Sequence, residues 1–402
     1  MKLFGKLILL FVIIISSFVF FVFNVYRDVN FTKANQPDQI KNFQAEKNST
    51  LQWDKEIKNG IIIFSSSETG YKLGLSKGEA LQAEIKEIVN ILNTEIFPEN
   101  LSGGVAKIVS LFKAKQFWEN IPAHYQLEIA GIAQGADVSI NDILLINVFD
   151  DISNVLGCSS IVIPKGEKSE YLIHARNLDY NLPQLAGKNI VYIHQNESEE
   201  FQFLTVGFPG YVGALTGINS AGVSLTNHTS ATFDVNLGEP TGFTYRRILE
   251  EANLISEVKE ILEGTQKTQG NNLMVGSFNE NKVSVFELTA SYSEERYLMK
   301  SCLTTTNHFQ SEVMQNRFKQ FLGASKLRNE AMQNFCEKNK FITIEDVINL
   351  MSNYDPNLSG WQTLANHGTI QAVVMIPGLR QIYVANGDTP PVNQAGYVLI
   401  EY

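Results

Sequence analysis

The stretch GCSSIVIPKGEKSEYLIHARNLDY, residues 157–180, contains the two runs that decide how this chain folds. The runs SSIVIP and EYLIHARN are rich in β-branched and aromatic residues and flank a polar segment, a pattern that predicts two strands. Cys158 stands at the head of the first run, directly after Gly157, a residue type that tolerates strained backbone geometry. A cysteine in this position can attack the carbonyl of its own preceding peptide bond. The alternative interpretation is a small buried hydrophobic residue.

The secondary-structure pattern changes at this stretch. Upstream, residues 78–150 carry apolar residues at helical spacing, and downstream strand-like runs such as FQFLTVGF and ALTGINSAGVSLTNH follow one another. A helical pattern at 245–262 precedes further strands, helices are expected at about 311–338 and 343–353, and the chain ends in strand-like runs. Because strands and helices come in blocks, the sequence predicts an α+β fold with helices packed on sheets.

Composition excludes several classes of protein and of ligand. The chain has 402 residues, 44% of them hydrophobic and 18% charged, so it can bury a sizeable core and is neither disordered nor a bare disulfide scaffold. Its formal net charge of −10 has the wrong sign for neutralising phosphates, so we expect no nucleic-acid partner. It has no Gly-rich phosphate loop, dinucleotide fingerprint or metal-ligand spacing, so we expect no cofactor and no metal.

The amino terminus carries an export signal. Lys2 and Lys6 precede the apolar run Leu7–Val25, and a polar stretch begins at Arg27. A spanning helix needs about 20 apolar residues, whereas the core of a cleavable signal peptide has about 7–15, so the run fits an uncleaved membrane anchor better than a removed signal peptide. The basic residues ahead of the run predict a cytoplasmic amino terminus, with the rest of the chain on the extracytoplasmic side, in the periplasm, the cell exterior or an organelle lumen.

The sequence predicts four segments. Residues 1–26 are the anchor or signal peptide, 27–58 a polar linker, 59–157 a helical segment and 158–402 a strand-rich segment. No repeat or Pro/Ser-rich linker follows residue 60, so we expect the last two segments to pack as one domain.

The stretch around Cys158 resembles a known group of enzymes. In the amino-terminal-nucleophile cysteine hydrolases of the choloylglycine hydrolase, acid ceramidase and N-acylethanolamine acid amidase group, a Cys-Thr-Ser segment opens the catalytic subunit and an Arg-Asn-x-Asp motif follows. Here Cys158 is followed by the motif at 176–179. The acyl-CoA:6-aminopenicillanic acid acyltransferases share this resemblance. Further matching segments are LEIAGIAQGADVSINDILLINVFDDISN, PGYVGALTGINSAGVSLTNH, TTTNH with Asn307, and QNRF with Arg317.

The resemblance implies a fold, a maturation step and an activity. The fold is a four-layer αββα sandwich, with 59–157 corresponding to the group's α-subunit and 158–402 to its β-subunit. Maturation is self-cleavage between Gly157 and Cys158, after which the new amino-terminal cysteine hydrolyses linear amides. The substrates of the group are acylated small amines, including ceramides, other fatty-acid amides, conjugated bile acids and penicillin V.

The chemistry of amide hydrolysis fits the matching residues. Once its α-amine is free, Cys158 offers both a thiol nucleophile and a base with an unperturbed pKa of about 7.7–8.0. Arg176 beside the thiol would favour the thiolate, and Asp179 could hold the charged α-amine. Asn227 and Asn307 could donate to the oxyanion. The alternatives are a surface ion pair for Arg176, a solvated strand-end carboxylate for Asp179 and turn-forming asparagines.

Two positions depart from the sequence pattern of the group, and a third residue has an alternative interpretation without a catalytic role. Ser159 replaces the usual Thr, which keeps the hydroxyl. His228 stands near the position of a Glu in the ceramidases and ethanolamide amidases, so with Asn227 the segment is more similar to choloylglycine hydrolases. Arg317 falls in a helical pattern, where a solvated helix face is the alternative to a catalytic role.

The other two cysteines leave two possibilities. Cys302 and Cys336 would both be exported, so they could form a disulfide and leave Cys158 free, or they could be separate buried thiols.

The sequence therefore predicts a membrane-tethered, self-processing cysteine amidohydrolase that acts through a Cys158 thioester. Its expected partners are an acylated amine, lipid-like in character, and the membrane. Two alternatives stay open. An amine could resolve the thioester, which would make the protein an acyltransferase, or the chain could be a non-catalytic membrane-anchored binding module.

Overall fold

The computed structural model describes residues 17, 22, 24–27, 51–153, 157–195, 200–298, 302–320, 323–358 and 360–402. The expected anchor at 1–26 lies outside these residues apart from 17, 22 and 24–26, and most of the expected linker lies outside them too. Among the described residues, no helix has the length and apolar character that a membrane crossing requires.

The larger sheet has nine strands in the order β1-β2-β5-β6-β7-β8-β9-β10-β11. Neighbouring strands are antiparallel except for the parallel pair β2 and β5. The strands are β1 (Trp53–Lys58), β2 (Ile61–Ser66), β5 (Ile190–His194), β6 (Phe203–Gly207), β7 (Thr216–Asn219), β8 (Val223–Thr229), β9 (Asn271–Ser277), β10 (Lys282–Leu288) and β11 (Ser293–Tyr297).

The smaller sheet has six strands in the order β12-β3-β4-β13-β14-β15 and is antiparallel throughout. Its strands are β3 (Gly157–Ile163), β4 (Ile173–Asp179), β12 (Leu303–Thr305), β13 (Thr369–Ile376), β14 (Gln381–Ala385) and β15 (Tyr397–Glu401). The two runs of the 157–180 stretch form strands, as the sequence predicted, and the structure pairs them with each other in this sheet.

The two sheets pack face to face through an aliphatic core. Val191 and Leu204 of the larger sheet belong to one buried cluster with Val373, Met375 and Val384 of the smaller sheet. Alternating apolar residues on facing strands produce this packing, because side chains of a strand point to opposite faces in turn.

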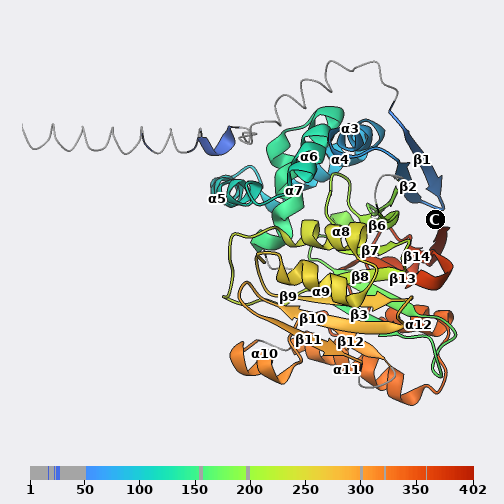
Figure 1. Ribbon diagram of the computed structural model, residues 1–402. Coiled ribbons are helices and arrows are strands. Elements are labelled where there is room, and N and C mark those ends of the chain that lie inside the picture. The colour runs from blue at the N-terminus through green and yellow to red at the C-terminus, as the bar shows by residue number, and fades with distance from the viewer. Residues whose placement is uncertain are drawn as a thin grey trace, which may run out of the picture.

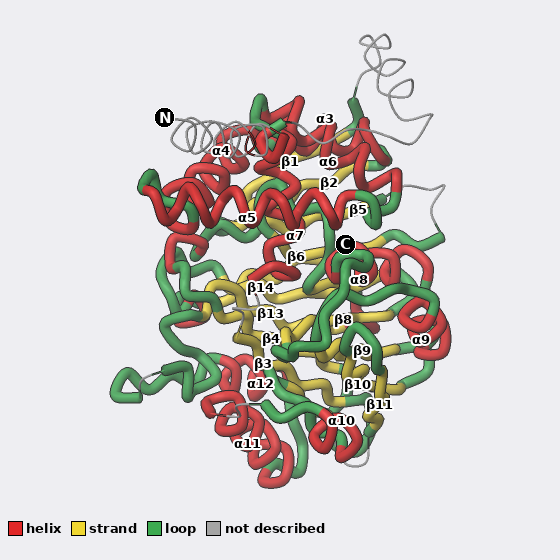
Figure 2. Tube along the Cα trace, turned by 90° about the vertical axis from the view of Figure 1, so that its left-hand side faces the viewer, coloured by secondary structure: helices red, strands yellow, loops and turns green. Residues whose placement is uncertain are grey.

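Helices cover both outer faces of the paired sheets. Helices α8 (Thr241–Glu251) and α9 (Ile255–Glu263) share a core cluster with the larger sheet, and α11 (Gly323–Lys338) and α12 (Ile344–Met351) share one with the smaller sheet. Figure 2 shows the strands through the middle of the molecule, with α9 to one side and α11 and α12 at the lower left. The order of layers is helix, sheet, sheet, helix, which agrees with the predicted α+β architecture.

A group of five helices lies at the β1–β2 end of the larger sheet, at the top of Figure 1. It packs on β2 and β5 through Phe64, Ile190 and Tyr192. Helices α3 and α6 approach closely, since a Cβ at Gly74 would lie 2.0 Å from the carbonyl oxygen of Glu128. The helices are α3 (Gly70–Ala80), α4 (Gln82–Ile91), α5 (Leu101–Trp118), α6 (Ala123–Ala136) and α7 (Ile140–Ser153), and the short α10 (Glu312–Arg317) lies elsewhere, near α11.

The expected linker at 27–58 needs a correction at its end. Residues 53–58 form β1, which pairs along its whole length with β2. This strand is the edge of the larger sheet and is almost entirely exposed, so it has no buried face to give an alternating apolar pattern. Folded structure therefore begins before the position that the sequence indicated.

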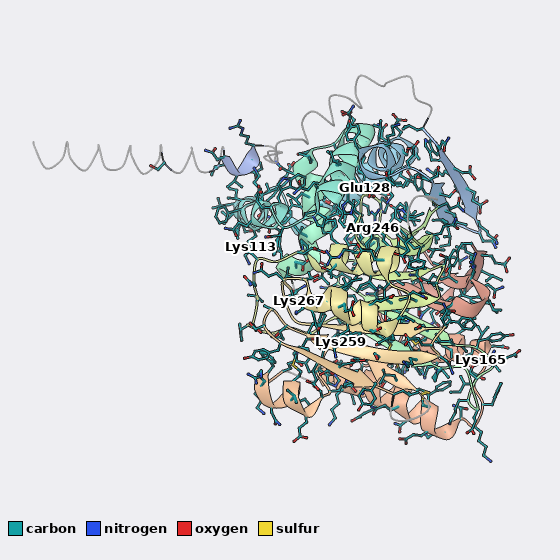
Figure 3. All side chains as sticks on the ribbon, viewed as in Figure 1. Lys113, Glu128, Lys165, Arg246, Lys259 and Lys267 are labelled. Atoms are coloured by element: carbon teal, nitrogen blue, oxygen red, sulfur yellow. A yellow bond between two sulfur atoms is a disulfide. The ribbon has the colours of Figure 1, made fainter. Side chains whose placement is uncertain are left out.

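A buried ionic network joins the helical segment to the strand-rich segment. Glu128 on α6 binds Lys77 at 2.7 Å and Arg246 on α8 at 2.6 Å, and all three side chains are at most 3% exposed. Arg246 also binds Glu250 at 2.8 Å. Figure 3 labels Glu128 and Arg246 on their two helices. The network crosses from residues before Cys158 to residues after it.

We expect Glu128→Gln to reduce the free energy of unfolding by about 3–5 kcal/mol, because it leaves Lys77 and Arg246 buried without their shared carboxylate. Urea denaturation of the full chain, carried in a Cys158→Ala background to keep one polypeptide, measures the change. The control is Glu330→Gln, which removes an exposed pair with Lys326 and should change stability by less than about 1 kcal/mol. Equal effects of the two variants would contradict the role given to the network.

Candidate active site

Cys158 is fully buried at the start of β3 and is the free cysteine of the described chain. Its strand pairs with β4 so that Cys158 lies opposite Leu178 and Gly157 lies opposite Asp179. Because side chains alternate along a strand, Cys158 faces the same side as Leu178 and Arg176, whereas Asp179 faces the other side. The register thus places Arg176, which contacts the thiol, and the Asp179 carboxylate, which lies beside the Gly157–Cys158 peptide bond, on opposite faces of the sheet.

Arg176 contacts the thiol directly. Its Nη2 donates to Cys158 Sγ at 3.4 Å, and its Nη1 donates to the carbonyl of Leu215 at 2.7 Å and to the Thr216 hydroxyl. Burial raises the pKa of the Cys158 thiol, and the Arg176 guanidinium opposes that rise. The predicted pairing of Arg176 with Cys158 is therefore present, in a setting where the thiol is uncharged until a base removes its proton.

Asp179 lies opposite Gly157, on the face of the sheet away from the Cys158 thiol. Its Oδ1 accepts from the Thr369 hydroxyl at 2.7 Å, and its Oδ2 is 3.5 Å from Nη1 of Arg328. Burial raises the pKa of Asp179, and the neighbouring Arg328 guanidinium lowers it. Since Asp179 is the register partner of Gly157, its carboxylate lies beside the peptide bond that self-cleavage would break.

Asn307 contacts the backbone of Cys158 rather than its thiol. Its Oδ1 accepts from the backbone N–H of Cys158 at 2.7 Å, and its Nδ2 donates to the Thr229 carbonyl at 3.0 Å. Asn307 follows β12, which pairs with β3. The sheet therefore brings this asparagine to Cys158, although its amide nitrogen donates to Thr229, and the predicted role as an oxyanion donor stays a prediction.

Arg328 is the residue that the sequence analysis missed. Its Nη1 donates to the Cys158 carbonyl at 2.7 Å and to the Ser159 hydroxyl at 2.6 Å, and its Nη2 donates to Asn307 Oδ1 at 3.0 Å. A signal was available, because Arg328 falls on the apolar face of α11 with Met332 and Cys336 at helical spacing. A cation on a buried helix face needs partners.

The resemblance pointed to Arg317 as a site residue, but Arg317 does not join the side chains around Cys158. It is exposed at the end of α10, and its guanidinium lies 3.9 Å from the centre of the Tyr292 ring. This exposed position on α10 agrees with the alternative interpretation of a solvated helix face.

A disulfide ties together the two elements that carry Asn307 and Arg328. Cys302, next to β12, is bonded to Cys336 on α11, with their Cα atoms 6.2 Å apart. Of the two possibilities that the sequence left open, the structure therefore has the bonded pair, and Cys158 is free.

Asn227 and His228 lie at the end of β8 and differ in their surroundings. The backbone N–H of Asn227 donates to the Leu215 carbonyl that also receives Arg176, yet neither amide atom of its buried side chain has a hydrogen-bond partner among the described residues. His228 bridges the Asn272 carbonyl and the Ser160 hydroxyl, and burial lowers its pKa well below the usual value. His228 is thus a neutral structural bridge, whereas Asn227 has free hydrogen-bonding capacity.

An apolar pocket adjoins Cys158. Its empty volume is about 790 Å³ with the open mouth included, and its lining comes from both sides of Cys158 in the sequence. Cys158 packs in one cluster with the pocket residues Leu178, Tyr180 and Ile370. Other parts of the wall are Ile88, Ile91, Phe149 and Phe208. No group of residues that could hold a metal ion is found in the described part of the chain.

The strand-rich segment of the chain matches a known protein family. The model of the family "Acyl-coenzyme A:6-aminopenicillanic acid acyl-transferase" matches residues 165–389, more than half of the chain. This match contains Arg176, Asp179, Asn307 and Arg328 and begins just after Cys158.

Curated relatives include acid ceramidases. The Homo sapiens acid ceramidase is 28% identical over 225 residues, which cover 49% of this chain and 54% of that protein. An uncharacterised protein of Archaeoglobus fulgidus is 26% identical over 276 residues, covering 60% of this chain and 46% of that protein. The aligned part of the chain thus spans about half of the length of these relatives.

Two solved structures are also similar to this chain, with TM-scores below 0.5. The Caenorhabditis elegans ortholog of N-acylethanolamine-hydrolyzing acid amidase is 19% identical and covers 55% of this chain and 94% of its own, with a TM-score of 0.42. A mutant conjugated bile acid hydrolase from Clostridium perfringens is 11% identical and covers 60% of this chain and 97% of its own, with a TM-score of 0.37.

Arg328, which contacts Cys158, and Arg317, which the sequence indicated, can be compared by their effect on cleavage before Cys158. We expect Arg328→Met to slow cleavage before Cys158 at least about 10-fold, because it removes charged hydrogen bonds to the Cys158 carbonyl and leaves Asp179 buried without its cation. Arg317→Met should leave the rate unchanged. Cleavage is followed on denaturing gels over time, with circular dichroism to establish that both variants fold. Slowing in Arg317→Met alone would contradict this assignment.

Gly157 has no room for a side chain. A Cβ at this position would lie 2.7 Å from the ring of Trp361 and 3.0 Å from Cβ of Asp179. We therefore expect Gly157→Ala to slow cleavage before Cys158, because it displaces the scissile carbonyl from the thiol. Replacing the ring as well, in Gly157→Ala/Trp361→Leu, should recover part of the rate. The idea fails if the double variant cleaves no faster than Gly157→Ala alone.

Proposed function

The chain belongs to the acyl-coenzyme A:6-aminopenicillanic acid acyl-transferase family, and from this membership and the contacts of Cys158 we propose that it is a self-processing cysteine amidohydrolase. It cleaves the linear amide bond of an acylated small amine. The observation that carries the proposal is the convergence of Arg176, Asn307 and Arg328 on one buried, free cysteine. Distant homology to acid ceramidases supports an amidase of this kind.

Self-cleavage is the first proposed step. The Cys158 thiol attacks the carbonyl carbon of Gly157, the C–N bond breaks as the C–S bond forms, and the amide nitrogen takes the thiol proton. Water then hydrolyses the thioester, which leaves a Gly157 carboxylate and a free α-amine on Cys158. The contacts of Arg328 and Asn307 with the Cys158 backbone support this step, because they hold the nucleophile against its own peptide bond.

Hydrolysis of the substrate follows the same chemistry. The free α-amine takes the thiol proton, Cys158 attacks the substrate carbonyl, and the protonated amine gives its proton to the leaving nitrogen. Water then resolves the thioester. The unpartnered amide of Asn227 supports a role as an oxyanion donor, and the carboxylate of Asp179 beside residue 157 supports a role in holding the charged α-amine.

The apolar pocket supports a substrate with an apolar acyl part. Its wall combines residues 88–150 with residues 178–371, so both segments are needed to form it. A pocket lined mostly by aliphatic and aromatic side chains favours burial of an acyl chain over a polar group. We propose a fatty-acyl or similarly apolar amide as the substrate.

Acyl transfer is the second candidate function. The description of the matching family names an acyl-transferase, and the same Cys158 thioester would react with an amine in place of water. The two outcomes differ only in which nucleophile reaches the thioester, so product analysis with and without added amine separates them.

We further propose that the catalytic part lies on the extracytoplasmic side, tethered through the apolar run 7–25. Two features support this proposal. The run has the length of a membrane span, and the Cys302–Cys336 disulfide belongs to an oxidising compartment.

We expect a covalent acyl intermediate on Cys158. Full-length protein is mixed with a fluorogenic N-dodecanoyl amide, quenched in acid and analysed by peptide mass spectrometry. The peptide that begins at Cys158 should carry one dodecanoyl group, and the group should transfer to added hydroxylamine. Arg176→Met should reduce acylation roughly 10-fold or more, because the thiolate loses its charged neighbour. Acylation at another residue, or hydrolysis by Cys158→Ala, would contradict the proposal.

A further inference from the structure

Arg328 and Asn307 reach Cys158 from two separate elements of the fold. Arg328 lies on α11, whereas Asn307 follows β12. The two side chains contact each other, since Arg328 Nη2 donates to Asn307 Oδ1 at 3.0 Å. Each also contacts the Cys158 backbone, Asn307 at the N–H and Arg328 at the carbonyl. The placement of α11 relative to the end of β12 therefore sets how these groups meet Cys158.

Ser325 connects the start of α11 to the segment 306–308, which follows β12. The residue is buried, at 8% exposure. Its hydroxyl accepts from the backbone N–H of Asn307 at 2.9 Å, contacts Nδ1 of His308 at 2.8 Å and donates to the Thr306 hydroxyl at 3.0 Å. The Thr306 hydroxyl donates to the Ser325 carbonyl at 3.0 Å. One serine thus contacts three consecutive residues, and the middle one is Asn307.

Ser325 and Arg328 lie on the same side of α11, because residues three positions apart are neighbours on the surface of a helix. Ser325 belongs to the first turn of α11, so its contact with 306–308 fixes the helix one turn before Arg328. The Cys302–Cys336 disulfide fixes the helix about two turns beyond Arg328. Ser325 is therefore the attachment on the side of α11 where the chain enters the site.

The hydroxyl of Ser325 matters because a buried N–H without an acceptor is costly. Without this hydroxyl, the N–H of Asn307 would need another acceptor, and the segment 306–308 would move relative to α11. A displacement of about 1 Å in the groups that position a reaction can reduce its rate about 100-fold. Ser325 can therefore influence the rate more strongly than its small side chain influences packing.

We propose that Ser325 is a positioning residue for the chemistry of Cys158. Through Asn307 and Arg328, it holds the carbonyl and the backbone nitrogen of Cys158 in the orientation that self-cleavage requires. After cleavage this nitrogen becomes the α-amine, which is the proposed base, and we expect Asn307 Oδ1 to remain its acceptor. The inference rests on the proposed amidohydrolase function and adds to its site a residue that controls the position of the nucleophile.

The rate of self-cleavage in single variants tests this inference. Ser325→Ala leaves the N–H of Asn307 without its acceptor, so cleavage before Cys158 should slow about 10-fold or more. Ser325→Thr keeps a hydroxyl and should stay within about 3-fold of the wild type. The control is Ser284→Ala, which removes a buried hydroxyl on β10 that donates to Glu295 at 2.8 Å and should leave the rate unchanged.

Two further measurements separate positioning from a general loss of stability. In an Arg328→Met background, Ser325→Ala should slow cleavage by less than about 3-fold more, because substitutions that act through one shared contact are not additive. In cleaved protein, Ser325→Ala should lower kcat for a fluorogenic N-dodecanoyl amide roughly 10-fold with KM almost unchanged, since the described wall of the apolar pocket does not include Ser325. Urea denaturation in a Cys158→Ala background compares the stabilities of the variants.

The inference is overturned if Ser284→Ala slows cleavage as much as Ser325→Ala does, or if Ser325→Ala keeps its full effect in the Arg328→Met background. A folded Ser325→Thr that cleaves as slowly as Ser325→Ala also overturns it, as does an unfolded Ser325→Ala, which would make Ser325 a determinant of folding.

Failure of this inference can be told apart from failure of the proposed function. If Ser325→Ala cleaves at the wild-type rate, the inference alone is overturned, because a wild-type Cys158 that becomes amino-terminal and acylated leaves the amidohydrolase proposal intact. A wild-type chain that stays uncleaved, with an unreactive Cys158, removes both.

Discussion

The antiparallel pairing of β3 with β4 determines which groups can reach Cys158. It places Cys158 opposite Leu178 and Gly157 opposite Asp179. A slip of one residue would exchange the two faces and move Arg176 away from the thiol. The remaining contacts follow from this register, because β12 pairs with β3 on its other edge and brings Asn307 to the Cys158 N–H. The active-site geometry is thus a property of the sheet rather than of a loop.

Most of this arrangement could be predicted from the sequence, because its determinants are local. Strand patterns, the helical segment before Cys158 and the Arg-Asn-x-Asp motif all lie within short stretches. Arg328 could not be found in the same way, since its contact with Cys158 depends on how α11 packs on the smaller sheet. The resemblance pointed to Arg317 instead, which lies exposed at the end of α10. The edge strand β1 was missed because it buries almost nothing.

The helical segment before Cys158 has two roles in the folded protein. It supplies Glu128 to the buried ionic network with Arg246, and it supplies Ile88, Phe149 and Asp150 to the pocket. After cleavage before Cys158, we therefore expect the two parts to stay together. Their dissociation would separate Glu128 from Arg246 and leave a buried cation without its carboxylate.

The central claim is that Cys158 becomes an amino-terminal nucleophile, and intact mass with amino-terminal sequencing tests it most directly. The full-length protein and its Cys158→Ala variant are incubated side by side at neutral and acidic pH. The account predicts a new amino terminus at Cys158 in the wild type only, with both fragments still associated under native conditions. If both proteins stay as single chains under every condition, Cys158 lacks its general base and the account is contradicted.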